Sequence, residues 1–277
     1  MRTDDDPGRP RWAPDTLLDR VVVVTGAARG IGRACVTRVL ECGGSVVAVD
    51  VDAAALDSLV AELSARRLRT VVADVNTEAG ADAAVAVADR DFGGTHVLIN
   101  NVGGMAAVPP QRFVDYELDQ WEALLALNLR PAFLVTRAVL RSANADRLES
   151  IVNVGASLSE RSSPHLSAYG AAKAAVTQLT RTLTVELGRS GVRVNCVAPG
   201  FTTTPASAQF VTPERRRDTE QAVPLGRVAS PVEMADVIVF LASGFASFVS
   251  GQTIVVDGGL LTTTLRRPRE WNEPREQ

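Results

Sequence analysis

Tyr169 and Lys173 are the residues of this sequence best suited to acid-base chemistry. Lys173 is the only lysine among 277 residues, and the other 28 of the Lys and Arg residues are arginine. Arginine replaces lysine well at a surface, but not where a compact ammonium on a flexible stem is required. Residues four apart share one face of a helix, and a cation beside a phenol lowers its pKa from about 10. The pair therefore predicts a general acid and base. The alternative is a surface tyrosine and a chance lysine on an alanine-rich helix.

A glycine-rich turn near the N-terminus predicts a dinucleotide site. Residues 20–25 contain four consecutive valines, an apolar, β-branched run typical of a buried parallel strand. Gly26, Gly30 and Gly32 follow in the spacing G-x-x-x-G-x-G, and an amphipathic helix comes next. Glycines allow a tight turn in which backbone N–H groups at a helix N-terminus approach the pyrophosphate. The position between a strand and a helix is what makes this pattern a strong signal.

Asp50 predicts which dinucleotide is bound. It closes the second apolar strand, 18 residues after Gly32, where an acid hydrogen-bonds the adenosine ribose hydroxyls of such folds. The alternative is a solvated strand end or a cap for the helix at 53–63. A 2′-phosphate near this carboxylate would cost roughly 4 kcal/mol at about 4 Å and an effective dielectric of about 20. Arg29 in the glycine turn favours the phosphate, but the carboxylate is expected to be nearer, so we expect NAD.

The order of elements predicts an α/β fold, a doubly wound, seven-stranded parallel sheet with helices on both faces, Rossmann-like in form. Seven β runs alternate with six helices. The strands are expected at 20–25, 45–50, 70–73, 97–100, 150–154, 192–197 and 253–256, with long helices at 117–143 and 168–188.

The domain organisation follows from the same pattern. We expect a single domain over residues 17–262, a flexible arm at 1–16 and a polar tail at 263–277. Residues 201–229 lack strand character, and long segments of this kind are usually functional, so they are expected to form a substrate lid.

Composition and charge exclude several classes of protein. The net charge of −3 implies no nucleic-acid partner. No apolar run approaches about 18 residues, and the acidic N-terminus lacks a secretory signal, so we expect neither a membrane span nor export. Cys35, Cys42 and Cys196 are scattered and have no metal-type spacing. We therefore expect reduced cysteines, no metal site and a cytoplasmic location.

Asn128 is unexpected within an apolar helix, which favours either a buried, functional amide or a polar face.

Taken together, the motifs resemble those of the short-chain dehydrogenases/reductases over about residues 18–260. The resemblance rests on Thr25-Gly26-x-x-x-Gly30-Ile31-Gly32, Asp74, Asn100-Asn101-x-Gly103, Asn128, Tyr169-x-x-x-Lys173 and Pro199-Gly200.

The resemblance implies a role for each matching residue. Tyr169 is the acid and base for the substrate oxygen, Lys173 lowers its pKa and binds the nicotinamide ribose, and Asn128 holds a water of the proton relay. The two long helices resemble the family's oligomer interface, usually in a homotetramer, with a homodimer as the alternative. The expected cofactor-binding residues are Gly26, Arg29, Gly30, Ile31, Gly32, Asp50, Asp74, Val75, Asn101, Gly103, Tyr169, Lys173, Pro199, Gly200 and Thr204. Among them Asp74 and Val75 would touch adenine, Asn101 would lie beside its ribose, and Thr204 would bind the carboxamide.

One departure concerns the serine that polarises the substrate oxygen in this family, commonly 13 residues before the tyrosine. That position is Ala156, whereas Ser157 and Ser159 lie one and three residues later. Ser157 would face away along an extended chain unless the backbone twists, and Gly155 allows such a twist. We expect Ser157 to be the donor, with Ser159 or no serine as the alternatives.

These residues predict an NAD-dependent oxidoreductase that moves a hydride between nicotinamide and a secondary alcohol or ketone. The alternatives are a cofactor-binding sensor or scaffold without redox turnover, or another reaction such as dehydration or epimerisation. The substrate is expected to be a small, largely apolar or alicyclic molecule, because five apolar residues are placed to line its pocket: Met105, Val108, Leu158, Phe201 and Phe210. The run Arg215–Arg217 either binds a carboxylate or phosphate or forms a solvated helix face.

Overall fold

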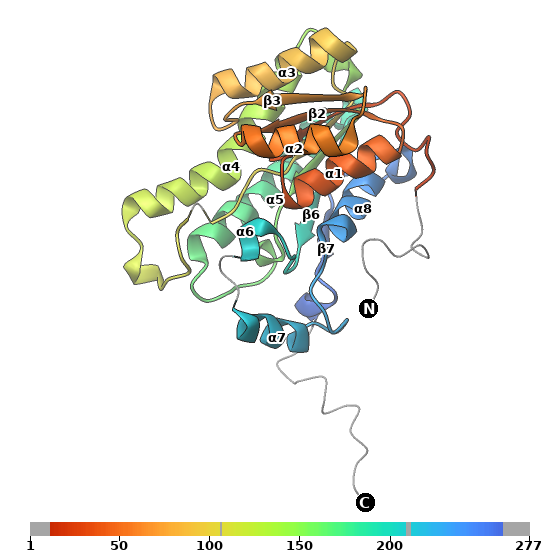
Figure 1. Ribbon diagram of the computed structural model, residues 1–277. Coiled ribbons are helices and arrows are strands. Elements are labelled where there is room, and N and C mark those ends of the chain that lie inside the picture. Colours follow the sequence, from red (N-terminus) through yellow and green to blue (C-terminus); the bar gives the residue numbers. More distant parts are fainter. Residues whose placement is uncertain (1–11, 106, 209–211, 263–277) are drawn as a thin grey trace, which may run out of the picture.

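The computed structural model describes residues 12–105, 107–208 and 212–262, and it confirms the predicted fold class. Seven parallel strands lie in the order β3-β2-β1-β4-β5-β6-β7, with helices on both faces (Figure 1). The strands are β1 (Val21–Thr25), β2 (Ser45–Asp50), β3 (Leu68–Val72), β4 (Val97–Asn100), β5 (Ser150–Val154), β6 (Arg193–Pro199) and β7 (Thr253–Val256). The helices are α1 (Gly30–Glu41), α2 (Ala53–Leu63), α3 (Glu78–Phe92), α4 (Leu118–Arg141), α5 (Ser167–Leu187), α6 (Pro205–Ala208), α7 (Pro213–Ala222) and α8 (Pro231–Ala242).

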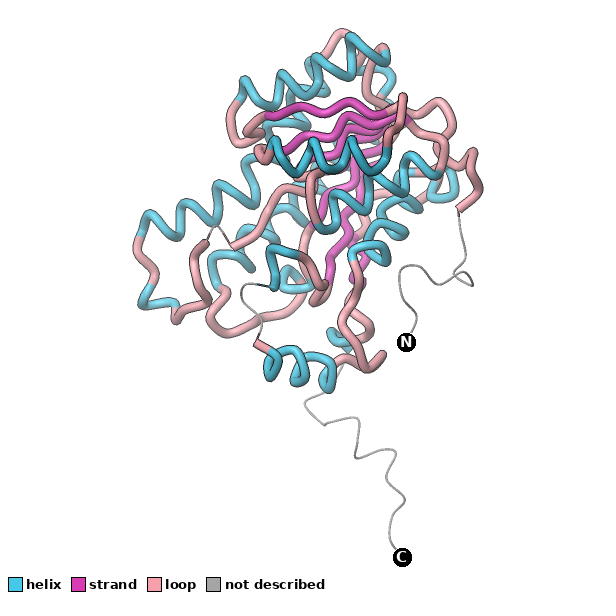
Figure 2. Tube along the Cα trace, in the orientation of Figure 1, coloured by secondary structure: helices cyan, strands magenta, loops and turns pink. Residues whose placement is uncertain are grey.

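Both faces of the sheet are covered, which explains why its central strands are apolar throughout rather than alternating. In β1, Val22 and Val24 pack into one core cluster with residues of α1, α2 and α8. Val21 and Val23 pack into the other, with residues of α3, α4 and α5. Figure 2 shows the strands as a central layer between these two sets of helices.

The chain reverses its direction of winding between β1 and β4. From β1 it proceeds outward to β2 and β3 and then returns to β4 on the other side of β1. Ligands of open α/β sheets bind beyond the carboxyl ends of the strands at such a switch point. The carboxyl end of β1 is the glycine turn, so the fold places the predicted dinucleotide site at this point.

The structure corrects the predicted strand at the sheet edge. β3 spans Leu68–Val72 instead of 70–73, because it is a half-exposed edge strand with a weak apolar pattern. Within the predicted arm, the Trp12 ring lies 6.0 Å from that of Phe245, whereas residues 13–15 are exposed. Residues 1–11 and the tail at 263–277 lie outside the described residues.

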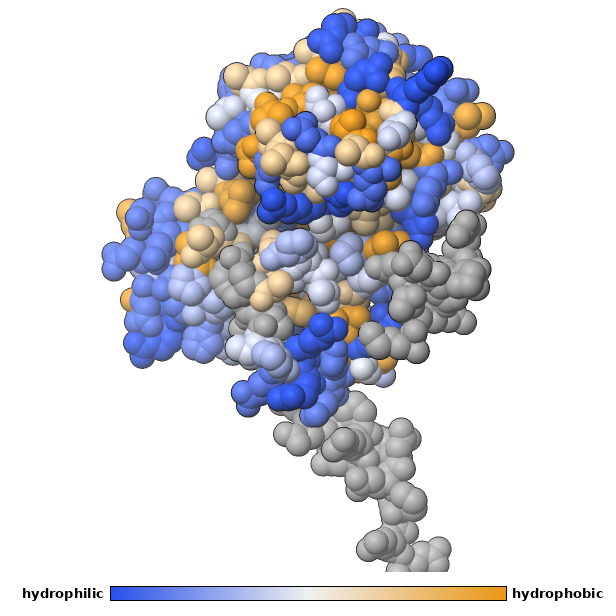
Figure 3. Space-filling model, viewed as in Figure 1, coloured by the Kyte–Doolittle hydropathy of each residue, from blue (hydrophilic) through white to orange (hydrophobic). Residues whose placement is uncertain are grey.

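The predicted lid contains helices that periodicity did not reveal. Within 201–229, α6 and α7 are short, and α7 is exposed and charged. Arg216 pairs with Glu220 on α7, and Arg217 is exposed, which favours a solvated helix face for this run. Figure 3 shows hydrophilic residues over α7 at the lower edge of the molecule.

α4 is long and apolar enough to cross a membrane by length and composition alone. Half of its most apolar window is buried within the protein, where the helix packs between α3 and α5. The apolar residues Leu134, Val135 and Val139 belong to the core cluster on that face of the sheet. Packing inside the protein therefore accounts for the buried half of this apolar window.

His96 is a buried titratable group at the amino end of β4, far from the glycine turn. Its Nδ1 accepts a hydrogen bond from Val21 N at 3.1 Å, so the ring is held neutral. Burial, and then the positive charge of Arg147, lowers the pKa of His96, while Glu149 opposes the shift and Arg20 adds to it.

We predict that His96 makes the fold sensitive to mild acid. Below about pH 6.5 the unfolded chain binds a proton that the folded protein resists, so the free energy of unfolding falls as the pH drops through this range. His96→Asn keeps an acceptor for Val21 N without a titrating ring. Urea unfolding at about pH 7.5 and about pH 5.5 should show a larger loss for the wild type than for the variant. Equal losses would exclude this role.

Candidate active site

The glycine turn is shaped so that side chains would obstruct it. Gly26 and Gly30 have φ values of +62° and +54°, which favour glycine. A Cβ on Gly32 would overlap the carbonyl of Gly26. Ile31 instead turns inward and packs against the core. The turn therefore leaves the first N–H groups of α1 accessible to an anion, as a pyrophosphate requires.

Asp50 lies beside this turn with its carboxylate fixed by backbone groups. Ala28 N donates to Oδ2 at 3.0 Å, and Asp52 N donates to Oδ1 at 3.1 Å. Each oxygen keeps a further lone pair for a ribose hydroxyl. The neighbouring Arg29, which could favour a phosphate, forms an ion pair with Asp52. Asp52 is also the N-cap of α2 and accepts from Ala55 N.

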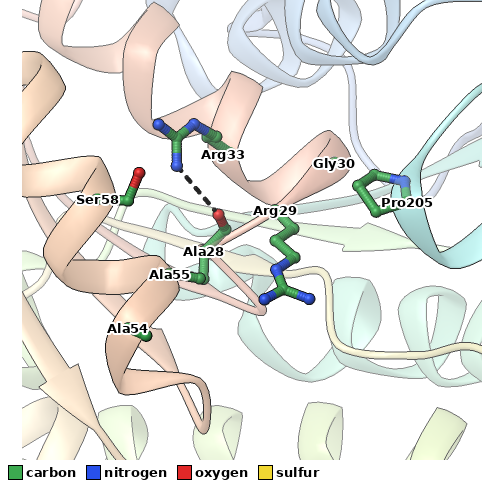
Figure 4. A pocket seen from close by; sticks show the side chains of 8 residues that line it. All are labelled: Ala28, Arg29, Gly30, Arg33, Ala54, Ala55, Ser58 and Pro205. Atoms are coloured by element: carbon green, nitrogen blue, oxygen red, sulfur yellow. Dashed lines mark hydrogen bonds between the residues drawn. The ribbon is translucent and has the colours of Figure 1, made fainter.

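A hollow of about 460 Å³ lies next to the glycine turn, between α1, α2 and the start of α6 (Figure 4). Arg33 crosses its wall, donates to the Ala28 carbonyl at 3.4 Å and pairs with Glu62 on α2. The lining residues are Ala28, Arg29, Gly30, Arg33, Ala54, Ala55, Ser58 and Pro205. Arg29 and Gly30 were predicted from their motif, whereas the contributions of α2 were not, because no motif marks them.

The end of β4 is tied to the glycine turn by Asn101. Its Nδ2 donates to the carbonyls of Thr25 and Gly26, both at 3.0 Å. Its backbone N–H donates to the Thr25 hydroxyl, also at 3.0 Å. Asn101 therefore fixes the distance between two loops at the switch point, whatever else it contacts.

Lys173 is buried, with 3% of its surface exposed, and its Nζ donates to the Val154 carbonyl at 2.9 Å. It makes no ion pair with any residue that the structure describes. The ammonium lies 6.0 Å from the centre of the Tyr169 ring. A carbonyl partner satisfies a hydrogen of the ammonium without neutralising its charge, so that charge stays available to Tyr169.

Asn128 is buried, which agrees with the predicted buried amide and not with the alternative of a residue on a polar helix face. Its Nδ2 donates to the carbonyls of Gly104 and Leu124, and its Oδ1 accepts from Gly104 N. Gly103 lies against both Asn128 and Lys173: a Cβ there would be 2.6 Å from the Lys173 Nζ and 2.7 Å from the Asn128 Oδ1. The loop after β4, the middle of α4 and the start of α5 therefore meet at one point.

Burial sets the ionisation of the Tyr169 and Lys173 pair. It raises the pKa of Tyr169 to about 12 and lowers the pKa of Lys173 to about 8, the latter partly opposed by the Cys196 thiol. The direction for Tyr169 differs from the sequence-based expectation. The reason is that taking the phenol out of water outweighs the attraction of an ammonium 6.0 Å from its ring.

The two candidate serines lie on one short 3₁₀ turn, Ser157–Ser159, directly after β5. Ser157 is 4% exposed, and its hydroxyl has no hydrogen-bond partner within the described part of the chain. The Ser159 hydroxyl donates to the Ala156 carbonyl at 2.8 Å and accepts from Thr177 at 3.2 Å. Ser157 is thus the serine with a hydroxyl free for a substrate. Its turn comes from the 3₁₀ geometry and not from Gly155, whose φ is not positive.

Two predicted adenine contacts lie at the end of β3. Asp74 is exposed and accepts from Asn76 N at 2.9 Å. Val75 is 4% exposed and packs into the core. The exposed Asp74 side chain is accessible to a ligand, whereas Val75 has only backbone atoms to offer.

The segment after β6 reaches the glycine turn. Pro199 ends β6, and a Cβ on Gly200 would lie 2.6 Å from Asp257 Cα, so this bend depends on glycine. Thr204 lies over Gly30, where a Cβ would be 3.1 Å from the Thr204 Cγ2. The structure therefore brings Thr204 to the predicted cofactor site.

Sequence reasoning missed a network of polar side chains beneath the site. Asn100 on β4 donates to Thr136 on α4 and to Asn153 on β5, and Asn153 donates to Thr180 on α5. The available signal was an asparagine in each of two otherwise apolar strands, which the register places side by side. This network joins the strands to the two helices that carry the candidate catalytic residues.

The fold and the site combine a glycine turn at the switch point of an α/β sheet, of the shape that a dinucleotide requires, with a tyrosine beside a buried lysine. The model of the family described as enoyl-(acyl carrier protein) reductase matches residues 26–261. The chain belongs to the short-chain dehydrogenase/reductase family, and it is an oxidoreductase of the kind that uses a nicotinamide cofactor.

Known relatives are similar over most of their length. A 3-oxoacyl-(acyl-carrier-protein) reductase of Thermotoga maritima is 36% identical over 88% of this chain and 99% of its own. The cis-4-hydroxycyclohexanecarboxylate dehydrogenase of Sinomonas cyclohexanicum is 39% identical over 88% of this chain and 98% of its own. A crystal structure of a glucose/ribitol dehydrogenase of Brucella melitensis superposes with a TM-score of 0.82 at 33% identity, over 88% and 98% of the two chains.

We predict that Gly103→Ala impairs catalysis without unfolding the protein. The added Cβ displaces the Lys173 amine or the Asn128 amide, and misplacement of about 1 Å costs roughly a hundredfold in rate. The matched control is Gly188→Ala, at a helical position where a Cβ meets nothing within 4 Å. Steady-state kinetics should show loss of kcat for the first variant only, and a fully active Gly103→Ala would contradict the packing described.

Proposed function

We propose that the protein is an NAD(H)-dependent oxidoreductase that transfers a hydride between nicotinamide and a carbon bearing a secondary hydroxyl or a ketone. The observation that carries the proposal is the buried Lys173 ammonium, bonded to the Val154 carbonyl and lying beside Tyr169. Burying a charge without a partner of opposite charge costs free energy, so such a charge is expected where it serves a function. Stabilising a phenolate is such a function.

The residues that line the turn fit a dinucleotide. Gly26, Gly30 and Gly32 would admit the pyrophosphate to the N-terminus of α1, and Asp50 would accept hydrogen bonds from the adenosine ribose. Asn101 and Thr204 flank the same turn. When bound, NAD accepts the hydride from an alcohol and NADH delivers it to a ketone.

Proton transfer is the task of this chain's own residues. In ketone reduction, the Tyr169 O–H bond breaks and its proton goes to the substrate oxygen. The pKa of about 12 keeps the phenol protonated at neutral pH for this step. In alcohol oxidation Tyr169 takes the proton back, and the Lys173 ammonium stabilises the phenolate that must first form. Ser157 donates a hydrogen bond to the same substrate oxygen as negative charge develops on it.

The proposed substrate is small and largely apolar or alicyclic. Met105, Leu158 and Phe201 are half-buried near the site, whereas Val108 packs against Leu124 in a small core cluster. Phe210 lies outside the described residues. The Sinomonas relative, named for a hydroxylated cyclohexane acid, supports an alicyclic substrate. Assembly into a homotetramer or homodimer stays a prediction.

The function is tested by removing the proton donor and by exchanging the one lysine for arginine. Tyr169→Phe should lose at least about a hundredfold in kcat because no proton can be transferred. Lys173→Arg should lose turnover despite its charge, because a guanidinium is too broad for a site bounded by Gly103 and Asn128. The reverse exchange Arg181→Lys, at an exposed position of the same helix, is the control.

Nicotinamide absorbance with a panel of alicyclic ketones and secondary alcohols measures turnover, and fluorescence titration measures NADH binding. Tyr169→Phe should bind NADH as the wild type does. A wild type that binds NADH but oxidises and reduces nothing would favour the sensor or scaffold. A Tyr169→Phe variant with normal kcat would refute the acid-base assignment.

We also predict that Asp50 gives NAD at least a tenfold advantage over NADP in kcat/KM, which requires only about 1.4 kcal/mol. Asp50→Ala should lower that ratio, because the carboxylate fixed by Ala28 N and Asp52 N no longer opposes a 2′-phosphate. Asp82→Asn removes an exposed carboxylate of α3, which does not line the hollow, and should leave the ratio unchanged. Equal efficiency with both cofactors in the wild type would refute the preference.

A further inference from the structure

The turn that carries Ser157 is joined to α5 at two points. The first is the bond from the Lys173 Nζ to the Val154 carbonyl, at the last residue of β5. The second is the contact of 3.2 Å between the hydroxyls of Thr177 and Ser159. The end of β5 and the 3₁₀ turn are therefore each hydrogen-bonded to α5, the helix that carries Tyr169.

The spacing of Lys173 and Thr177 places these two contacts on one face of α5. Residues four apart lie one above another on a helix, so Tyr169, Lys173 and Thr177 follow each other along the same face. Eight residues of helix span about 12 Å. Thr177 and the Ser159 beside it lie at the far end of this face from Tyr169, while Ser157 begins the same turn.

Three threonine hydroxyls of α5 donate to the carbonyl four residues earlier, and the Thr177 hydroxyl has a second partner outside the helix, Ser159. Thr180 and Thr184 donate to the carbonyls of Val176 and Thr180 at 2.9 Å. The Thr177 hydroxyl lies within hydrogen-bond distance of both the Lys173 carbonyl, at 3.3 Å, and the Ser159 hydroxyl, at 3.2 Å. Thr177 is 3% exposed, so no water competes at the surface for these contacts.

Ser159 in turn closes the 3₁₀ turn on itself. Its hydroxyl and its backbone N–H both donate to the Ala156 carbonyl, at 2.8 and 2.9 Å. Beneath the turn, Cys196 fills the space that a side chain on Gly155 would take, with its Sγ 2.8 Å from such a Cβ. The backbone from Ala156 to Ser159 is thus fixed from both sides.

We infer that Thr177 and Ser159 are positioning residues, which hold the Ser157 hydroxyl at the right distance from the substrate oxygen. The Ser157 hydroxyl has no partner within the described residues, so only its backbone fixes it. Thr177 fixes that backbone through Ser159. The inference rests on the proposed function, in which Ser157 and Tyr169 bind one substrate oxygen.

The test is a set of hydroxyl deletions made alone and in pairs. Ser157→Ala should lower kcat by roughly 10²–10³. Thr177→Val and Ser159→Ala should each lower it by roughly tenfold, because they loosen the turn without removing the donor. The double variant Thr177→Val/Ser159→Ala should be no worse than Ser159→Ala alone, since Thr177 acts on the turn only through Ser159. Thr177→Ser, which keeps the hydroxyl, should restore kcat.

The decisive readout is the same deletions in the Ser157→Ala background. With the donor gone its position no longer matters, so neither Thr177→Val nor Ser159→Ala should lower kcat further. NADH affinity should stay unchanged throughout. Thr184→Val, which deletes a hydroxyl bond farther along α5, should alter thermal stability but not kcat.

Each other outcome overturns a particular statement. A loss from Ser159→Ala that persists in the Ser157→Ala background would make Ser159 itself the donor. Normal kcat in Thr177→Val, with or without a change in melting temperature, would leave Thr177 only a packing role. If the wild type is active and Ser157→Ala has the same kcat, the positioning role is refuted, while the role of Tyr169 is not affected. A wild type without turnover would refute the proposed function and the positioning role with it.

Discussion

The hydrogen bond from the Lys173 ammonium to the Val154 carbonyl is the constraint on which the site depends. It places a charge inside the protein without neutralising it, and burial lowers the pKa of this amine to about 8. Holding the charge there requires a neighbour without a side chain, Gly103, and a fixed amide, Asn128. Elements far apart in sequence, the ends of β4 and β5 and the middle of α4, are arranged around one amine of α5.

The fold was predictable because its strands are buried on both faces. Continuous β-branched runs such as Val21–Val24 are typical of strands that are buried on both faces. The predicted element boundaries were less accurate where the residues of an element are less buried. β3 lies at the sheet edge, and its boundaries shifted. α7 is solvated on a surface segment, so it has no apolar periodicity from which a helix could be predicted.

The site was predictable where chemistry restricts the residue type, as at the glycine turn, Asp50 and the Tyr169–Lys173 pair. It was not predictable where the structure uses ordinary residues. A threonine such as Thr177 occurs on countless helices, and only the packing of a turn against it makes its hydroxyl specific. The pKa of Tyr169 was also beyond sequence reasoning, because it depends on how far the phenol is removed from water.

The scarcity of lysine gives the molecule an unusual chemical property. Apart from the α-amino group, Lys173 is the one primary amine in the chain, and the folded protein encloses it almost completely. An amine-selective acylating reagent consequently has no surface lysines on which to be consumed. Acylation of the Lys173 amine therefore requires an opening of the fold that exposes it, and the rate of labelling measures how often such openings occur.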